Sequence, residues 1–198
     1  MRLNGRLLRT HTAALVVACA LASPAWARPA SDLSSIRIDN FGRVNAKYYR
    51  GAQPHGRDYA DLASLGVKTI IDLTKGGDAS EPAQVQASGM RFFRIPMTTH
   101  ERPSAEAIAQ FLKIVDDPVN EPVYVHCQGG RHRTGVMTAI YRMTDEGWTA
   151  DRAFAEMKLY KFGADYLHAE FKDFVYGYHV AAAAATVTAA PVASKTGG

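Results

Sequence analysis

The sequence contains little cysteine and no long uninterrupted hydrophobic segment. Its 198 residues include only two cysteines, Cys19 and Cys127. Small exported domains with weak cores are held together by several disulfides, and two cysteines cannot supply such a framework. The main apolar run, Ala13–Ala22, is shorter than the roughly 20 residues that a membrane-spanning helix needs. We therefore expect neither a disulfide scaffold nor a membrane span in the folded chain.

Positive charge is also less abundant than the total suggests. The formal net charge is +4, but the first 27 residues contain three arginines (Arg2, Arg6 and Arg9) and no acid. Without that stretch the charge falls to +1, which argues against a nucleic-acid partner. The composition, with 47% hydrophobic, 21% charged and 10% aromatic residues, excludes wholesale disorder and predicts one folded domain.

The N-terminal segment has the organisation of a secretory signal peptide. Met1–Thr12 is polar and positively charged, the apolar run Ala13–Ala22 follows, and Ala25-Trp26-Ala27 matches the A-x-A cleavage pattern. We expect cleavage after Ala27 and export to the periplasm or the medium. The alternative to this cleavage site is a loose lipoprotein cleavage site at Cys19. Cleavage after Ala27 removes Cys19, so we expect Cys127 to be the one cysteine of the mature chain.

Hydrophobic patterns in the rest of the chain alternate between strand-like and helix-like segments. Strands are predicted where β-branched and aromatic residues cluster, at Phe41–Val44, Lys47–Arg50, Val67–Leu73, Phe92–Ile95 and Val123–Val125. Helices are predicted where apolar residues recur at helical spacing, around 59–63, after Ser80, over 104–115, and around 136–143, 153–157 and 167–178. Ser80 and Ser104 are the expected N-caps. The alternation predicts an α/β domain with a mostly parallel central sheet flanked by helices.

These patterns divide the chain into four parts. Residues 1–27 form the signal peptide, 28–40 a polar lead-in, 41–180 the folded domain, and 181–198 an Ala/Thr/Pro/Gly-rich tail that we expect to be disordered. We expect the domain to be a monomer.

The residues with the clearest chemical role surround Cys127. The segment from Val123 to Gly135 reads VYVHCQGGRHRTG, so a cysteine ends a buried strand and Arg133 opens a helix after five loop residues. A loop of this length can turn its backbone N–H groups inward to bind an anion, and the helix N-terminus adds positive potential. Gly129 and Gly130 permit close approach of the backbone, and Arg133 can bind two oxygens of a phosphate.

The same environment acts on the cysteine. Amide dipoles and the Arg133 guanidinium favour the negatively charged form of the Cys127 sulfur, so we expect a thiolate at neutral pH. We expect Thr134 to donate a hydrogen bond to that sulfur, and His126 to brace the loop through backbone groups. The predicted site binds a tetrahedral oxyanion above a nucleophile, and the loop residues Gln128, Gly129, Gly130, Arg131 and His132 are the expected substrate contacts.

The motif His126-Cys127-x5-Arg133-Thr134 resembles the signature of cysteine-dependent protein tyrosine and dual-specificity phosphatases. The stretch Tyr49-Arg50-Gly51-Ala52-Gln53-Pro54 extends the likeness to the compact atypical members of the plant and fungal type, over about residues 41–179. The resemblance implies hydrolysis through a phosphocysteine, a phosphorylated protein or small molecule as substrate, and no metal or organic cofactor.

The sequence departs from this family in one respect. The resemblance implies a general-acid Asp on a loop before the signature, but the loop Met97–Arg102 contains none, and Thr99 stands at about its place. Glu101 is our candidate acid and His100 the second choice. We expect Asp116 and Asp117 to be remote and Asp72 to be structural.

A weak or absent acid favours leaving groups that depart easily. Phenols and phosphates need less protonation than alkyl alcohols, so we expect activity on aryl phosphates such as phosphotyrosine, or on phosphoanhydrides and polyphosphorylated molecules, including inositol polyphosphates. Arg131, His132 and Lys75 would add positive charge near the cup. The alternatives are a rhodanese-like sulfurtransferase, an arsenate reductase or low-molecular-weight phosphatase, and a non-catalytic phospho-ligand binding module.

Overall fold

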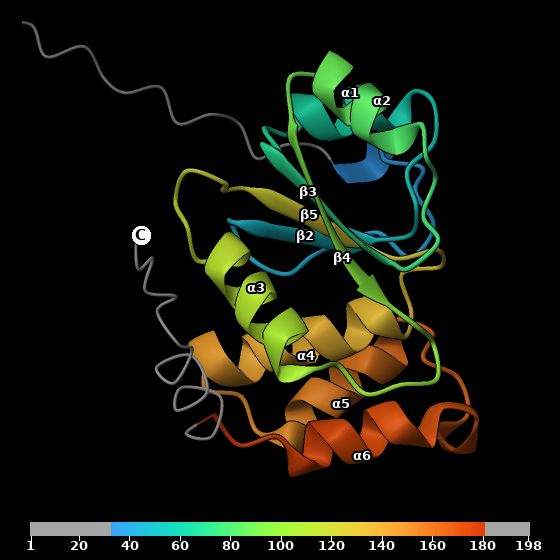
Figure 1. Cartoon of the computed structure of the whole chain (residues 1–198), viewed down its shortest axis with the longest axis vertical. Helices are drawn as coiled ribbons and strands as arrows, with labels where there is room; N and C mark the ends of the chain where they lie inside the picture. Colours follow the sequence, from blue (N-terminus) through green and yellow to red (C-terminus); the bar gives the residue numbers. More distant parts are fainter. Residues whose placement is uncertain (1–32, 181–198) are drawn as a thin grey trace, which may run out of the picture. The chain divides into compact units, whose positions relative to one another are not determined.

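A five-stranded sheet lies at the centre of the computed structural model, which describes residues 33–180 (Figure 1). The strand order is β1-β2-β5-β3-β4. The strands are β1 (Gly42–Arg43), β2 (Tyr48–Gly51), β3 (Thr69–Thr74), β4 (Arg91–Met97) and β5 (Val123–His126). β1 is antiparallel to β2, and the other neighbours are parallel. The predicted α/β domain with a mostly parallel sheet is confirmed.

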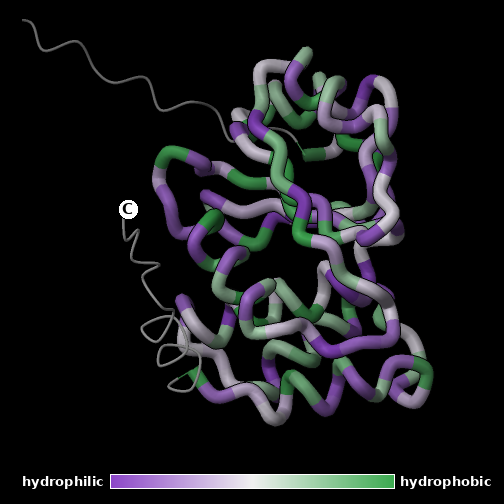
Figure 2. Tube along the Cα trace, in the orientation of Figure 1, coloured by the Kyte–Doolittle hydropathy of each residue, from purple (hydrophilic) through white to green (hydrophobic). Residues whose placement is uncertain are grey.

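Helices cover both faces of this sheet. α1 (Asp58–Ser64) and α2 (Glu81–Ala87) lie on one face, and the other helices lie on the opposite face (Figure 1). These are α3 (Ala105–Val115), α4 (Arg133–Asp145), α5 (Ala150–Leu159) and α6 (Ala169–Gly177), with short 3-10 turns at Leu33–Ser35 and Asp165–His168. Hydrophobic and hydrophilic stretches alternate along the outer helices (Figure 2), as amphipathic helices require.

The central strands are buried on both sides because helices cover both faces. Every residue of β3 and β5 is buried. Successive side chains point to opposite faces, so Val123 and Val125 join the core under α3–α6, while Tyr124 joins the core under α1 and α2. This packing fixes the end of β5, and with it Cys127, at the carboxyl edge of the sheet.

Two expected helix details differ from the structure. Ser104 caps α3 as predicted, because its hydroxyl accepts from the Ala107 N–H. Ser80 makes no cap bond, since its N–H and hydroxyl both donate to Asp78. The helix expected around 167–178 is present as α6, but it begins two residues later: a 3-10 turn ends at His168, and Leu167 stays exposed outside the core.

The packed domain begins before the predicted boundary at residue 41. Ile38 is buried in the core beneath α1 and α2, and Asn40 bonds to the loop after Cys127. The predicted lead-in therefore contributes its last residues to the fold. The predicted signal peptide (1–27) and tail (181–198) lie outside the described residues. Within residues 33–180, no helix is long and apolar enough to cross a membrane.

Candidate active site

The loop after Cys127 presents a row of unused backbone donors. It connects β5 to α4 at the carboxyl edge of the sheet. The N–H groups of Gln128 to His132 donate to no acceptor in the part of the chain that the structure describes. Five adjacent N–H groups beside the N-terminus of a helix are suited to binding an anion. The anion-binding loop predicted from the sequence therefore has the expected donors.

Gly130 gives the loop its shape. Its φ is +65°, and a Cβ there would lie 2.7 Å from the Ala52 nitrogen and closer still to the Gly51 carbonyl. Only glycine combines this backbone conformation with such close packing against the end of β2. Gly129 is different: it has no positive φ, and a Cβ would meet only the flexible Arg131 side chain, at 3.6 Å. The expectation that Gly129 is sterically required is wrong.

The Gly130 carbonyl anchors the loop from behind. It accepts hydrogen bonds from Arg50 Nη2 at 2.9 Å and from Asn40 Nδ2 at 2.8 Å. The Arg50 guanidinium is fully buried and stacks on the Tyr160 ring, with the carbon of the guanidinium 3.9 Å from the ring centre. Burial lowers the pKa of Arg50. Arg50 belongs to the Tyr49–Pro54 stretch that resembles the phosphatase family, but the sequence alone indicated no role for it.

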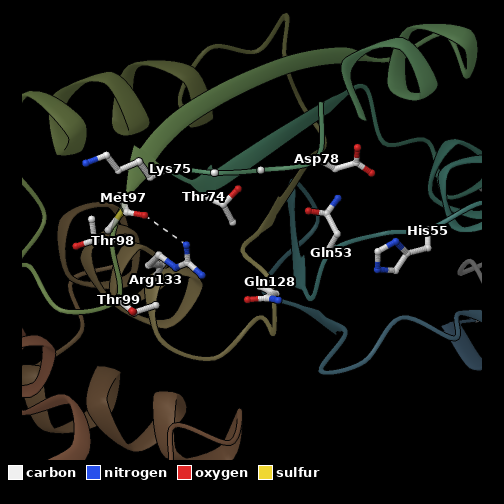
Figure 3. Close-up of a pocket in the computed structure, with 12 residues that line it drawn as sticks. Gln53, His55, Thr74, Lys75, Asp78, Met97, Thr98, Thr99, Gln128 and Arg133 are labelled. Carbon is white, nitrogen blue, oxygen red and sulfur yellow. Dashed lines mark hydrogen bonds between the residues drawn. The ribbon is translucent and has the colours of Figure 1, made fainter. Parts of the chain in front are cut away.

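A cleft of about 550 Å³ opens over the loop (Figure 3). In that view Gln53 and His55 lie on one side, and Arg133, Thr98 and Thr99 lie on the other. The complete lining is Gln53, His55, Thr74, Lys75, Gly76, Gly77, Asp78, Met97, Thr98, Thr99, Gln128 and Arg133. The volume suits a small phosphorylated group.

Arg133 is positioned for an anion. Its Nη1 donates to the Met97 carbonyl at 3.3 Å, and its buried Nε has no hydrogen-bond partner among the described residues. Cys127 starts the loop and is 3% exposed. Of the segment from Cys127 to Arg133, Gln128 and Arg133 line the cleft, while Cys127 and the other loop residues do not.

Other loop residues are placed differently from the predictions. Arg131 does not line the cleft and forms an ion pair with Asp39, at 3.7 Å. His132 also lies outside the lining, with Nε2 3.0 Å from the Phe162 carbonyl and its ring 3.7 Å from the His168 ring. The Thr134 hydroxyl is buried and has no hydrogen-bond partner among residues 33–180, so the expected bond to the Cys127 sulfur is not formed.

The candidate acids lie beside the cleft. Glu101 accepts from the Thr98 hydroxyl at 2.9 Å and lines an adjoining cavity of about 290 Å³. The His100 ring stacks on His168, with centroids 5.9 Å apart. Neither lines the cleft, although Thr98 and Thr99 of the same loop do. Their catalytic roles remain predictions.

Asp78 is the carboxylate that sequence reasoning missed. Among the described residues it is the one acidic side chain that lines the cleft, on the loop between β3 and α2 (Figure 3). Hydrogen bonds from the Ser80 backbone and hydroxyl lower the pKa of Asp78, so it is ionised at neutral pH and unsuited to donating a proton. No spacing rule connects it to Cys127 in the sequence.

His126 is held by side chains as well as by the backbone. Its Nδ1 lies 3.4 Å from the Cys127 carbonyl, as the bracing role requires, and its Nε2 lies 3.0 Å from Glu81 Oε1. Asp72 is structural, as predicted: it accepts from the Thr74 hydroxyl and from Arg94.

One group of side chains near the cleft has the chemistry of metal ligands. His100, His168 and Glu170 bring one possible ligand atom each to within 4.8 Å of the others. Hydrogen bonds account for their proximity without a metal ion, because His168 Nδ1 lies 3.1 Å from the Thr99 carbonyl and 3.3 Å from Glu170. This group links the loop after β4 to the start of α6.

A cysteine at the end of a core strand, a loop of free amides and an arginine at the next helix N-terminus define the class of cysteine-dependent phosphatases. The comparisons agree. Residues 24–173 match the family described as "DSP-PTPase phosphatase fused to NAD+ Kinase". The chain belongs to this DSP-PTPase phosphatase family, as the resemblance implied.

Named relatives place the chain among the atypical dual-specificity phosphatases. It is 32% identical over 141 residues to the dual specificity protein phosphatase TpbA of Pseudomonas aeruginosa, covering 71% of this chain and 61% of TpbA. It is 25% identical over 130 residues to the inositol diphosphatase SIW14 of Saccharomyces cerevisiae, covering 63% of this chain and 46% of SIW14. The chain thus aligns with less than two thirds of either relative.

Solved structures share the fold. The catalytic domain of SIW14 in complex with citrate has a TM-score of 0.66 at 22% identity, covering 76% of this chain and 92% of that one. TpbA of P. aeruginosa in complex with pTyr has a TM-score of 0.65 at 24% identity, covering 76% and 91%.

Proposed function

We propose that the protein is a phosphatase that hydrolyses phosphate esters or anhydrides through a phosphocysteine intermediate. One observation carries the proposal: the unpartnered N–H groups of Gln128 to His132 follow Cys127 directly, and Arg133, whose Nε is also unpartnered among the described residues, begins the next helix. These donors match the three equatorial oxygens of a phosphoryl group in transfer. Membership of the DSP-PTPase phosphatase family supports the same chemistry.

The reaction proceeds in two displacements. The Cys127 thiolate attacks phosphorus in line, so an S–P bond forms while the bond to the leaving oxygen breaks. That oxygen takes a proton from solvent or from an acid of the loop after β4. Water then attacks the phosphocysteine, which forms phosphate and restores the thiolate. The amides and Arg133 bind the spreading charge more tightly in the transition state than in the ground state.

We propose substrates whose leaving group departs easily. The residues that line the cleft include Thr98 and Thr99 from the loop after β4 but no carboxylic acid able to donate a proton, since Asp78 is ionised. Phenolate and phosphate leave with little protonation, which favours phosphotyrosine and other aryl phosphates.

Inositol diphosphates are the second candidate class. The related SIW14 is named an inositol diphosphatase, whereas TpbA is named a dual specificity protein phosphatase. Lys75 and His55 line the cleft and could bind further phosphates. In Figure 3 the Lys75 side chain extends away from Arg133, and it also lines the adjoining cavity.

A substrate panel tests the proposal. Phosphotyrosine peptide, phosphoserine peptide, an inositol polyphosphate and an inositol diphosphate are compared by phosphate release, with Cys127→Ser as the control. We expect phosphotyrosine or the diphosphate to be preferred and Cys127→Ser to be inactive. Preference for phosphoserine contradicts the leaving-group argument, and full activity of the serine variant excludes the nucleophile. Sulfur transfer from thiosulfate to cyanide would instead indicate a rhodanese.

We also propose that the enzyme is exported. The support is the order of the first 27 residues: a positively charged start, an apolar run and Ala25-Trp26-Ala27. N-terminal sequencing of the processed protein tests this. We expect a new terminus at Arg28, and exported protein that keeps Met1 would contradict the proposal.

A further inference from the structure

A carboxylate borders the cleft over the cysteine loop. Among the described residues, Asp78 is the one acid in the lining, which it shares with the positively charged Arg133 and Lys75. In Figure 3 Asp78 lies on the side of Gln53 and His55, across the cleft from Arg133. A negative charge at this place adds an unfavourable interaction for every further negative charge that a bound phosphate ester carries.

Hydrogen bonds hold Asp78 in place at both its side chain and its backbone. Its Oδ1 accepts from the Ser80 N–H at 2.7 Å and from the Ser80 hydroxyl at 2.8 Å. Its carbonyl accepts from Arg94 Nη2, also at 2.8 Å. The preceding residue, Gly77, is packed so closely that a Cβ there would overlap the Asp72 carboxylate. The Asp78 carboxylate therefore has a fixed position at the border of the cleft.

The negative charge of Asp78 is left without an ion pair. The guanidinium of Arg94 pairs with Asp72 instead, at 2.7 Å, and Asp78 forms no ion pair within residues 33–180. Its Oδ2 accepts no hydrogen bond from these residues, since both bonds from Ser80 go to Oδ1. The same two bonds lower the pKa of Asp78, so the charge persists at neutral pH. Oδ2 is available to a positive group of a bound molecule.

The segment Lys75–Asp78 carries opposite charges at its two ends. In Figure 3 the Lys75 side chain extends away from Arg133, and it also lines the adjoining cavity. Asp78 instead lies towards Gln53 and His55. A second charged group of a substrate that extends towards Asp78 is therefore attracted if it is positive and repelled if it is negative.

We propose that Asp78 is a specificity-determining residue that selects substrates with a positively charged group next to the phosphorylated one. The inference rests on the proposed function, because it takes the cleft as the substrate site. A lysine or arginine side chain beside phosphotyrosine supplies such a group, whereas an inositol diphosphate carries only negative charges. Attraction of one class and repulsion of the other both contribute to the preference. Asp78 thus favours phosphotyrosine in a basic protein segment over the second candidate class.

The substitution Asp78→Asn removes the charge and keeps the turn. The amide oxygen of asparagine can accept both hydrogen bonds from Ser80, so we expect the variant to fold. Asp117→Asn is the matched control. Asp117 is exposed, does not line the cleft, and accepts from the Val119 N–H at 3.0 Å in a similar turn. Both substitutions change the net charge of the chain equally, so a difference between them reports the charge at the cleft.

Binding of phosphotyrosine peptides provides the test. Two peptides differ only in the residues that flank the phosphotyrosine on both sides, which are lysine in one and glutamate in the other. Fluorescence anisotropy measures the Kd of each with Cys127→Ser, which avoids turnover. We expect the lysine peptide to bind about threefold more tightly. Asp78→Asn in the Cys127→Ser chain should abolish this preference, and Asp117→Asn should keep it. In 1 M salt, which screens charges beyond about 3 Å, the preference should shrink.

Several results would overturn the proposal. Tighter binding of the glutamate peptide by Cys127→Ser does so without any variant at position 78, as does failure of both peptides to bind. An equal change in both Kd values in Asp78→Asn would indicate a structural role only. A preference lost equally in Asp117→Asn would assign the effect to net charge. Turnover is tested separately with p-nitrophenyl phosphate and the unmodified protein. If no phosphate is released, the proposed function fails, while the binding data still decide the role of Asp78.

Discussion

Arg50 and Gly130 lie 80 residues apart in the sequence and are joined by a hydrogen bond of 2.9 Å behind the cysteine loop. The buried guanidinium donates to the carbonyl of the loop, while the loop amides on either side have no acceptor among residues 33–180. This bond fixes the loop against β2 through its carbonyl oxygen and leaves the loop N–H groups available. The anion site therefore depends on a residue of the second strand as well as on the signature itself.

Replacing Arg50 should damage both stability and activity. Arg50→Lys loses the planar stacking on Tyr160 and the directed bond to Gly130, and it keeps a buried charge with fewer donors. We expect a loss of about 3 kcal/mol in the free energy of unfolding and at least about tenfold in kcat/KM. Urea unfolding and hydrolysis of p-nitrophenyl phosphate measure the two effects. The exposed Arg43→Lys is the control, and equal behaviour of the two variants would exclude the anchoring role.

The two glycines of the loop should respond in opposite ways to alanine. Gly130→Ala places a Cβ against Gly51 and Ala52 at a positive φ, so we expect a destabilisation of about 3 kcal/mol or more. Gly129→Ala meets no backbone atom and should stay within about 1 kcal/mol of the unmodified chain. Thermal unfolding of the pair is the measurement. Equal melting temperatures would show that the loop adopts another conformation in solution.

Glu101 should matter little to an easy leaving group. Its carboxylate accepts from Thr98 and lines the adjoining cavity, so Glu101→Gln should change kcat for an aryl phosphate by less than about threefold. The measurement compares an aryl with an alkyl phosphate. A loss of about a hundredfold on the alkyl substrate alone would instead identify Glu101 as the general acid after movement of the loop.

Acidification should destabilise the fold through His132. Burial, followed by the nearby His168, lowers the pKa of His132. Because the folded pKa lies below the unfolded value, the unfolded chain binds more protons in that interval. The stabilising contribution of the neutral ring is thus present above the unfolded pKa of about 6.5 and is lost as the pH falls through the folded pKa.

The comparison of His132→Gln with the unmodified chain measures this contribution. Gln can keep a hydrogen bond to the Phe162 carbonyl but does not titrate. We expect the difference in unfolding free energy between pH 7.5 and pH 5 to be smaller in the variant. An identical pH dependence would assign the effect to other groups.

Much of the fold could be predicted because its signals are local. Val123–Val125 is a short apolar run that ends at Cys127, and Ile108, Phe111 and Val115 recur at helical spacing and are buried. The start of the last helix was predicted at Leu167, two residues early, because periodicity alone does not reveal the break at His168. The prediction that position 129 needs a glycine failed for a related reason, since the residue type alone does not reveal which atoms surround it.

The sequence by itself determined the order of the chemical groups: from Cys127 to Arg133, along one strand, loop and helix, a thiol, a row of amides and a guanidinium follow one another. This is possible because those positions are covalently close and each element has a fixed geometry. Only the tertiary structure decided which distant residues support them, with Arg50 and Asn40 behind Gly130, Glu81 against His126, and Glu101 beside the cleft. Such contacts follow from the packing of the whole sheet and its helices, and no local pattern specifies them.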